Sequence, residues 1–350
     1  MRSTGNCCVK PRSATDSQRV TKVSRMIVNV VSFVGISVLV TLGLALGLVA
    51  SQKPVTLPDM QGGLGFAALT AQSAAPAVPQ ISVPMRDGWA MPVRHIPATD
   101  KPLLVLIHGS GWHGQQFDRL AASLQGEAEI LAPDLRGHGA NPARRGDIDH
   151  IDQFEEDLAD LIAAHRKPQQ KLIVAGHSSG GGLAIRFASV PQAQNVDHVI
   201  LMAPFLKHNA PTTRPNSGGW AHVLIRRMIG LTILNTMKIT ALNHLTVIQF
   251  AMPAVVLDGP LGATATTAYS YRLNTGYAPR ADYKADIAAL PPFTLLSGTQ
   301  DEAFFADQYV PVMSAENPRG TYHLIEGQTH LGIVDAPESL AILKGVLRGL

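Results

Sequence analysis

A short run of small residues, Gly176-His177-Ser178-Ser179-Gly180, follows an apolar run typical of a buried strand and precedes a segment with helical spacing. This is a G-x-S-x-G pattern in the strand–turn–helix context that gives the pattern meaning. Such a turn strains its central residue, and glycines two positions before and after it let the neighbouring backbone come close. We therefore expect Ser178 to expose its hydroxyl as a nucleophile. The alternative, a glycine-rich turn of a dinucleotide-binding unit, lacks the G-x-G-x-x-G spacing here.

Short apolar runs alternate with helical stretches from residue 79 onward. Continuous apolar strands that alternate with helices are typical of a parallel sheet covered on both faces. Asp87-Gly88 adds a hairpin-turn signal between the first two expected strands. Residues 205–290 break the alternation, so we expect them to form an insertion above the sheet. The expected strands lie at 81–86, 89–96, 103–107, 129–132, 171–175, 198–202, 293–297 and 322–325, and the clearest helices at 153–164, 181–189, 307–314 and from 337 onward.

A serine hydroxyl becomes a strong nucleophile only when an oriented base takes its proton. The candidates follow Ser178 in the order acid then histidine, which is the order on this type of topology. Asp301 comes directly after one expected strand, and His330 lies in the loop after the next. We therefore expect Ser178, Asp301 and His330 to be the catalytic residues. Glu302 is a spare acid and His323 lies inside a strand pattern, so both rank lower.

Two backbone N–H groups are expected to stabilise the oxyanion that forms on a substrate carbonyl. The Ser179 N–H lies at the start of the helix after the nucleophile, where the helix dipole favours negative charge. The second donor should come from the loop after the first central strand, which reads His108-Gly109-Ser110-Gly111-Trp112. We expect the Ser110 N–H to be that donor, and His108 to support the loop through side-chain hydrogen bonds rather than to catalyse.

Several stretches of the chain together resemble the α/β-hydrolase superfamily, over about residues 80–350. They are His108-Gly109, Pro133-Asp134-Leu135-Arg136-Gly137-His138-Gly139, the G-x-S-x-G run, Asp301 and His330. Within the superfamily, the chain is similar to the monoacylglycerol lipase and lysophospholipase-like branch. The resemblance implies an α/β-hydrolase fold, with a mostly parallel central sheet, helices on both faces and a helical cap insertion at 205–290. Ala140-Asn141 departs from the family pattern, which often has a small residue and a serine after Gly-His-Gly.

Residues 26–50 form a run of 25 residues without a charged side chain. As a helix, at about 1.5 Å per residue, such a run exceeds the roughly 30 Å hydrocarbon core of a membrane. Six basic residues and one acidic residue precede it, so the positive-inside rule predicts a cytoplasmic N-terminus and an exported catalytic domain. We therefore expect a basic tail at 1–25, a transmembrane helix at 26–50, a flexible linker at 51–78 and a hydrolase domain at 79–350. A cleaved signal peptide is the alternative.

Beyond residue 25 the chain carries 23 basic and 25 acidic residues. This balance offers no excess of cations to neutralise phosphates, so no nucleic-acid partner is expected. The only cysteines are Cys7 and Cys8, which excludes a thiol nucleophile or a Cys-ligated zinc in the domain, and no cofactor or metal is expected. No Asn-x-Ser/Thr follows the apolar run, which favours a bacterial inner-membrane protein with its domain in the periplasm.

The expected cap contains a stretch, 205–257, with five Lys and Arg residues and no Asp or Glu. Its residues 220–231 are spaced like an apolar face of one helix, with His222 and Arg226 opposite and Arg227 near the apolar side. A basic, apolar lid could lie against anionic lipid and admit acyl chains. The alternative is an ordinary helical cap with solvated basic residues. The residues on the expected apolar face are Trp220, Val223, Leu224, Met228 and Leu231.

These features together predict a membrane-anchored serine hydrolase that cleaves carboxylic esters by a Ser-His-Asp acyl-enzyme mechanism. Its expected substrates are lipid-like, such as monoacylglycerols, lysophospholipids or related acyl esters. Two alternatives stay open: a hydrolase-fold protein that binds a ligand without turnover, and a peptidase or thioesterase of the same superfamily. The serine in the elbow argues against epoxide hydrolases and dehalogenases, which have an aspartate there.

Overall fold

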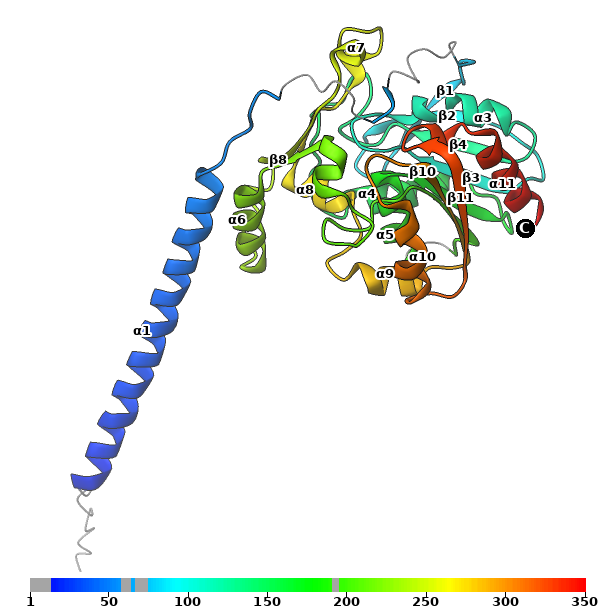
Figure 1. Ribbon diagram of the computed structural model, residues 1–350. Coiled ribbons are helices and arrows are strands. Elements are labelled where there is room, and N and C mark those ends of the chain that lie inside the picture. The colour runs from blue at the N-terminus through cyan, green and yellow to red at the C-terminus, as the bar shows by residue number, and fades with distance from the viewer. Residues whose placement is uncertain (1–13, 58–63, 67–74, 191–194) are drawn as a thin grey trace, which may run out of the picture. The chain divides into compact units, whose positions relative to one another are not determined.

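A computed structural model describes residues 14–57, 64–66, 75–190 and 195–350 (Figure 1). The chain forms two compact units. The first contains the described residues up to Gln52 together with Arg226–Thr240, and the second contains Lys53–Ile225 and Ala241–Leu350. The catalytic residues expected from the sequence all belong to the second unit.

The second unit is built on an eight-stranded sheet of order β1-β2-β4-β3-β5-β6-β10-β11. β1 pairs with β2, and β2 with β4, in antiparallel fashion, and all other neighbours are parallel. This confirms the expected mostly parallel sheet, with a hairpin whose turn contains Gly88 at φ 83°. The strands are β1 (Gln80–Pro84), β2 (Ala90–Ile96), β3 (Leu103–Ile107), β4 (Glu129–Pro133), β5 (Leu172–His177), β6 (His198–Met202), β10 (Phe293–Gln300) and β11 (Gly320–Thr329).

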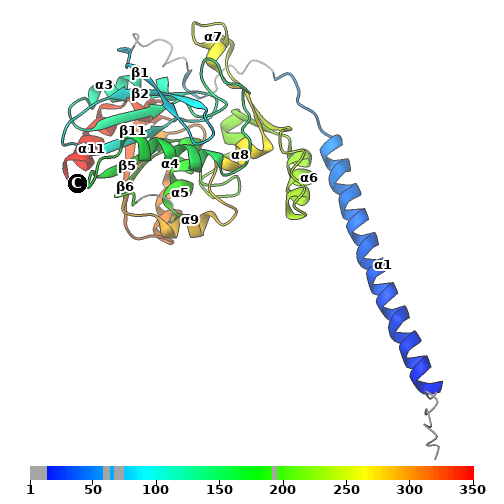
Figure 2. The same ribbon diagram turned by 180° about the vertical axis from the view of Figure 1, so that it is seen from behind.

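The central strands β3, β4 and β5 are buried along their whole length. Helices cover both faces of the sheet, which is why these strands are continuous apolar runs rather than alternating ones. α3 (Asp118–Ser123) and α11 (Pro337–Arg348) lie on one face, and α4 (Gln153–His165) and α5 (Ser179–Ala188) on the other (Figures 1 and 2). The carboxyl ends of β5, β10 and β11 lead into the loops that carry Ser178, Asp301 and His330, so the sheet brings these residues to one edge.

The insertion at 205–290 contains more strand than the sequence indicates. Its second-unit part forms a three-stranded antiparallel sheet, β7-β8-β9, with short helices around it. The expected apolar helix face over 220–231 is wrong, because 221–223 is a strand that pairs with β8 and the helix begins only at Ile225. Trp220 stacks on Phe250 with ring centroids 5.3 Å apart, a cross-strand contact that favours the strand over local helical spacing. The elements are β7 (Ala221–Val223), β8 (Thr246–Phe250), α7 (Ala254–Leu257), β9 (Ala268–Ser270), α8 (Tyr271–Gly276) and α9 (Tyr283–Ala289).

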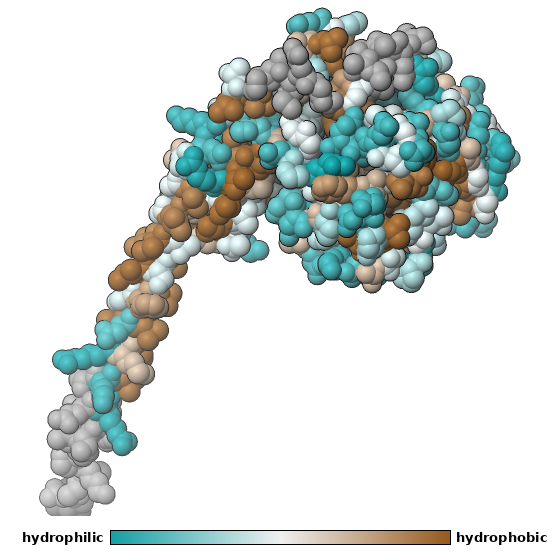
Figure 3. Space-filling model, viewed as in Figure 1, coloured by the Kyte–Doolittle hydropathy of each residue, from teal (hydrophilic) through white to brown (hydrophobic). Residues whose placement is uncertain are grey.

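The first unit pairs one long helix with a short one. α1 (Ala14–Ala50) continues the apolar run back through the described part of the basic tail, so that basic and apolar side chains share one helix (Figure 3). α6 (Ile225–Thr236) packs on its end: Gly230 lies so close to α1 that a Cβ there would be 2.6 Å from the Ala45 carbonyl oxygen. The Arg226 N–H donates to the Gln52 side chain at 2.9 Å. Arg226 thus contacts Gln52, and Gly230, later in the chain, contacts the earlier residue Ala45. The two helices therefore run antiparallel.

The structure differs from two predictions made from the sequence, one about Arg227 in α6 and one about the linker at 51–78. The basic residues of the cap are expected to contact anionic lipid or to be solvated, but Arg227 is buried and its Nε donates to the Val49 carbonyl oxygen at 3.4 Å, near the end of α1. Within the expected flexible linker, the described residues Leu64 and Phe66 are buried in the core of the second unit instead. The remaining linker positions, 58–63 and 67–74, lie outside the described residues.

Candidate active site

Ser178 occupies the turn between β5 and α5 with φ 54° and ψ −121°. Side chains with a Cβ rarely adopt such angles, and they persist only where the surroundings fix them. Here the Ser178 N–H donates to the Met202 carbonyl at 3.0 Å, and the Ser178 carbonyl accepts from the Phe205 N–H at 2.9 Å. The turn also needs Gly180, where a Cβ would lie 2.2 Å from the Ile107 carbonyl oxygen. The structure thus holds the Ser178 backbone in a strained elbow.

Asp301 and His330 form a buried pair. His330 Nδ1 lies 2.9 Å from Asp301 Oδ2, and the other carboxylate oxygen accepts the N–H groups of Ala303 and Phe304 at 2.8 and 2.7 Å. Burial alone would raise the pKa of Asp301, but the His330 ring and these N–H groups lower it below its ordinary value. Because a carboxylate can only accept, His330 Nδ1 carries the proton and Nε2 is left to act as a base.

Glu302 contacts the same loop in a different way. Its Oε2 accepts the backbone N–H of His330 at 2.9 Å, and its Oε1 accepts the N–H of Gly65 at 3.0 Å. The Glu302 carboxylate therefore supports the backbone of the histidine loop, while Asp301 contacts the ring. This geometry agrees with ranking Glu302 below Asp301 as the acid.

A cavity of about 610 Å³ opens beside these residues, and both Ser178 and His330 line it. Its wall is mostly apolar, with Leu64, Phe66, Trp112, Trp220, Met252 and Val256 among the lining residues. Arg119 and Asp335 add a polar region, in which burial raises the pKa of Asp335 to about 6. The cavity therefore offers a mostly apolar surface next to the expected nucleophile.

The two expected oxyanion donors lie on facing loops. The hydroxyl oxygens of Ser110 and Ser179 are 2.5 Å apart, and both residues are only half-buried. Neither backbone N–H has an acceptor among the described residues, whereas the neighbouring Gly109 N–H is already bonded to Gln116 Oε1 at 3.0 Å. An N–H without a partner beside the nucleophile suits a group that binds a developing oxyanion.

The family model for serine aminopeptidase S33 matches residues 98–335. The chain belongs to this family. Monoglyceride lipase of Mus musculus is 24% identical over 246 residues, which cover 69% of this chain and 78% of the mouse protein. An uncharacterized protein of Mycobacterium tuberculosis is 33% identical over 103 residues, which span only 29% of each chain. Together with the fold, these relatives confirm the expected α/β-hydrolase resemblance.

Among solved structures, a membrane phospholipase A is similar in fold to this S33-family chain. The two align with a TM-score of 0.54 over 93% of this chain and 98% of the phospholipase, at 18% identity. At that identity the likeness concerns the fold alone.

Two residues of this α/β-hydrolase that the sequence did not single out connect the site's loops. Gln116 Nε2 donates to His177 Nδ1 at 2.7 Å, and His177 Nε2 donates to the His330 carbonyl oxygen at 2.9 Å. Burial lowers the pKa of His177 to about 3, so its ring is neutral and can accept from Gln116 while donating to His330. Through Gln116, which also binds Gly109, the oxyanion loop is tied to the histidine loop. Contacts between residues this far apart leave no pattern in the sequence.

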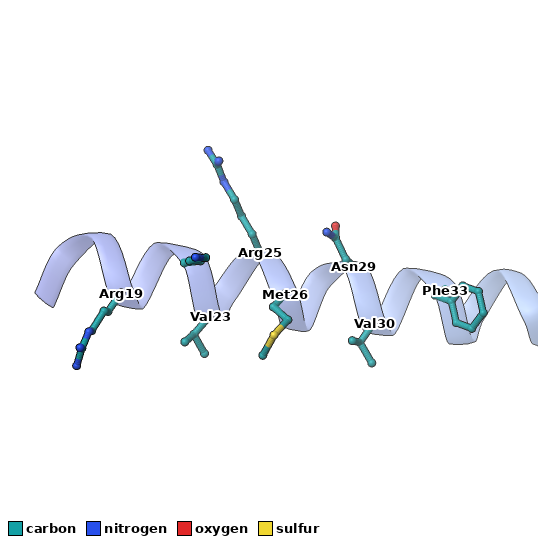
Figure 4. A pocket seen from close by; sticks show the side chains of 8 residues that line it. Arg19, Val23, Arg25, Met26, Asn29, Val30 and Phe33 are labelled. Carbon is teal, nitrogen blue, oxygen red and sulfur yellow. The ribbon is translucent and has the colours of Figure 1, made fainter. Parts of the chain in front are cut away.

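Two further features bear on ligands. Among the described residues, no group of three or more His, Cys, Asp or Glu side chains is placed to hold a metal ion. A second hollow, shown in Figure 4, runs along α1 between Arg19 and Phe33, and every residue that lines it comes from that one helix. It is the open side of a helix, where basic side chains give way to apolar ones, and it contains none of the expected catalytic residues.

Proposed function

We propose that this α/β-hydrolase is a membrane-anchored serine hydrolase that cleaves carboxylic esters of lipid-like substrates through an acyl-enzyme. One observation carries the proposal: Ser178, in a strained elbow, and His330, paired with Asp301, line the same cavity. This is the constellation of nucleophile, base and orienting acid that acyl transfer needs.

In the proposed reaction, Ser178 Oγ attacks the ester carbonyl carbon while His330 Nε2 takes the hydroxyl proton. The carbonyl electron pair moves onto oxygen, and the N–H groups of Ser110 and Ser179 stabilise the oxyanion. The intermediate collapses with cleavage of the bond to the alcohol oxygen, which receives the proton from His330. A water molecule, deprotonated by His330, then attacks the acyl-enzyme and releases the acid and free Ser178 by the same steps.

The apolar lining of the cavity supports a substrate with an acyl chain. Apolar side chains such as Trp112, Trp220 and Met252 would gain contact with a chain, at about 25 cal/mol for each Å² removed from water. The similarity to monoglyceride lipase agrees with lipid-like esters. Arg119 and Asp335 provide polar groups for the alcohol part of such a substrate.

Membrane anchoring rests on α1 and on its contact with α6. The span Lys22–Ala50 is long and apolar enough to cross a membrane, with a mean hydropathy of 2.4 over its most apolar 18-residue window. A signal sequence passes the same test, but cleavage after Ala50 would remove the surface on which α6 packs, including buried Ala45 and Val49. This contact supports an uncleaved anchor. The basic residues before the span support a cytoplasmic N-terminus and a periplasmic hydrolase domain.

The first experiment is labelling of the full chain in detergent micelles with a fluorophosphonate probe. The wild type should be labelled, Ser178→Ala should not be, and Ser179→Ala should still be labelled, because only Ser178 supplies the attacking oxygen. Labelling that survives in Ser178→Ala contradicts the proposed nucleophile. A wild type that is never labelled favours the hydrolase-fold protein without turnover.

The second experiment is an assay with matched ester, thioester and amide substrates of increasing acyl length. We expect turnover of the esters, highest for chains long enough to fill the apolar cavity. A preference for the amides would instead favour a peptidase.

A third experiment tests the anchor. The intact mass of the chain and its resistance to carbonate extraction from membranes distinguish an uncleaved helix from a removed signal sequence.

A further inference from the structure

We propose that Tyr269 and Tyr277, two residues of the insertion at 205–290, are positioning residues that set the geometry of the oxyanion loop. The inference rests on the proposed function, because it concerns the loop that carries the Ser110 N–H. Both tyrosines are almost fully buried, and both hydroxyl groups bond to the segment His108–Gly111.

Tyr269, on β9, lies at the centre of a continuous hydrogen-bond chain. Its hydroxyl oxygen accepts the Gly111 N–H at 2.6 Å and lies 2.7 Å from His138 Nε2. The other ring nitrogen of His138 lies 3.1 Å from the Arg136 carbonyl oxygen, which can only accept. His138 Nδ1 therefore carries a proton.

The protonation state of His138 fixes the direction of the chain. Burial lowers the pKa of His138 to about 4, so near neutral pH the ring has one proton and its Nε2 must accept. Burial also raises the pKa of Tyr269, so the phenol keeps its proton and donates it to His138. The hydroxyl oxygen is then an acceptor, which interacts with the Ser110 side chain as well as with the Gly111 N–H, so the peptide between Ser110 and Gly111 is held at its N–H.

Tyr277, directly after α8, holds the other side of the loop through His108. Its hydroxyl donates to the His108 carbonyl oxygen, and His108 Nδ1 donates to the Gly109 carbonyl oxygen at 2.9 Å. His108 Nε2 accepts the Leu135 N–H at 3.2 Å, so its ring is fixed as well. The expected role of His108 as a support of this loop agrees with these contacts.

The planarity of the peptide bond links these contacts to the oxyanion donor. In a trans peptide the carbonyl and the following N–H point in opposite directions within one plane. Fixing the Gly109 carbonyl therefore fixes the direction of the Ser110 N–H, and fixing the Gly111 N–H restrains the next peptide. Both restraints depend on tyrosines from the insertion, so the insertion contributes to the chemistry as well as to the cavity wall.

The test compares Tyr269→Phe and Tyr277→Phe with the matched control Tyr322→Phe, each in the full chain in detergent micelles. The Tyr322 hydroxyl is buried on β11 and has no hydrogen-bond partner among the described residues, so its removal tests the substitution alone. Losing a whole oxyanion donor lowers kcat by about 10²–10³, so loosening one should lower kcat by about 10-fold. We expect that fall in both test variants, with KM within about twofold and Tyr322→Phe unchanged.

Two readouts separate positioning from general loss of structure. An alkyl boronic acid, which forms a tetrahedral adduct with Ser178, should bind each test variant more weakly by the same factor as kcat/KM falls, while inhibition by a fatty acid product is unchanged. Hydrogen exchange of the Gly111 N–H should be faster in Tyr269→Phe than in the wild type. This readout does not depend on turnover.

The outcomes distinguish the two proposals. If the wild-type protein reacts with neither the fluorophosphonate nor the boronic acid, that result contradicts the proposed function and, with it, an oxyanion role for the loop. A reactive wild type in which Tyr269→Phe and Tyr277→Phe keep both kcat and boronate affinity contradicts the positioning role alone. Equal losses of boronate and product binding would assign the tyrosines to general stability, which also overturns the inference.

Discussion

The hydroxyl oxygens of Ser110 and Ser179 lie 2.5 Å apart and connect the two segments whose backbone N–H groups are the expected oxyanion donors. One residue follows β3 and the other begins α5, so this contact fixes the separation of the two expected oxyanion donors. Any change in that separation alters how well both donors reach one oxygen atom.

This contact predicts a coupled pair of substitutions. Ser110→Ala and Ser179→Ala each remove the same hydrogen bond, worth about 1 kcal/mol, so each should lower kcat by roughly fivefold. The double variant should lose little more than either single one, because the bond is already gone. Steady-state kinetics on the four proteins form a double-mutant cycle. Strictly multiplicative effects would show that the two hydroxyls act independently.

Asp301→Asn should retain the fold and lose turnover by several orders of magnitude, about 10⁴ in the best-studied serine protease triad. The amide presents the wrong hydrogen-bond pattern to His330 and no longer stabilises its protonated form. Glu302→Gln should lose far less, because an amide oxygen can still accept the His330 backbone N–H. Initial rates on one ester, with circular dichroism as a control for folding, test both. Turnover that is lost in Glu302→Gln and kept in Asp301→Asn would reverse the assignment.

Stability should fall as the pH drops below about 6.5. Burial lowers the folded-state pKa of His138 to about 4 and of His177 to about 3, both from 6.5, and lowers that of His108 as well. Below pH 6.5 the unfolded chain binds protons that the folded chain does not, so each imidazole removes up to about 1.4 kcal/mol per pH unit until its folded pKa is reached. Asp335, whose pKa burial raises to about 6, opposes this trend, and so do Asp118, Glu155 and Asp157, whose pKa burial also raises.

The measurement for this pH dependence is the urea midpoint in detergent at pH 7, 6 and 5. We expect the midpoint to decrease steadily over that range. A midpoint that is constant or rises toward pH 5 would mean that the three imidazoles are not buried in their neutral forms.

Gly230 gives a prediction for the packing of α6 on α1. A Cβ at Gly230 would lie 2.6 Å from the Ala45 carbonyl oxygen, so Gly230→Ala should force the helices apart and lower the melting temperature. Gly345, inside α11, is a matched control because a Cβ there meets nothing within 4 Å. Gly345→Ala should be neutral or stabilising by up to about 1 kcal/mol. Equal melting temperatures for the two variants would contradict close packing at Gly230.

Local sequence patterns predicted the parts of this molecule that depend on neighbouring residues. The strands, the elbow at Ser178 and the positions of Asp301 and His330 after β10 and β11 follow from apolar runs and from the turns that end them. The contacts that fix the site were not predictable in this way. Gln116 and His177 meet across 61 positions, and Tyr269 reaches Gly111 across 158. Such pairs depend on how the chain folds back on itself, and a single sequence contains no periodic signal for them.

The insertion was predicted least well for a related physical reason. Its strand β7 is three residues long and owes its conformation to pairing with β8, more than 20 positions later. A helical spacing of apolar residues exists in the same segment, and the tertiary contact between Trp220 and Phe250 overrides it. The conformation of such a short element is determined by the strand with which it pairs.

The antiparallel contact between α6 and α1 has a practical consequence for anyone who wishes to prepare the enzyme without its apolar helix. A version that starts at residue 79 keeps every expected catalytic residue, yet it discards Ala45 and Val49, against which Gly230 is fitted. It also discards Leu64 and Phe66, which line the cavity. Such a shortened protein would expose the apolar surface of α6 that packs on α1, and it would lack part of the cavity wall. Replacing α1 with a soluble helix that preserves its last three turns, and keeping residues 53–78, is the sounder engineering route.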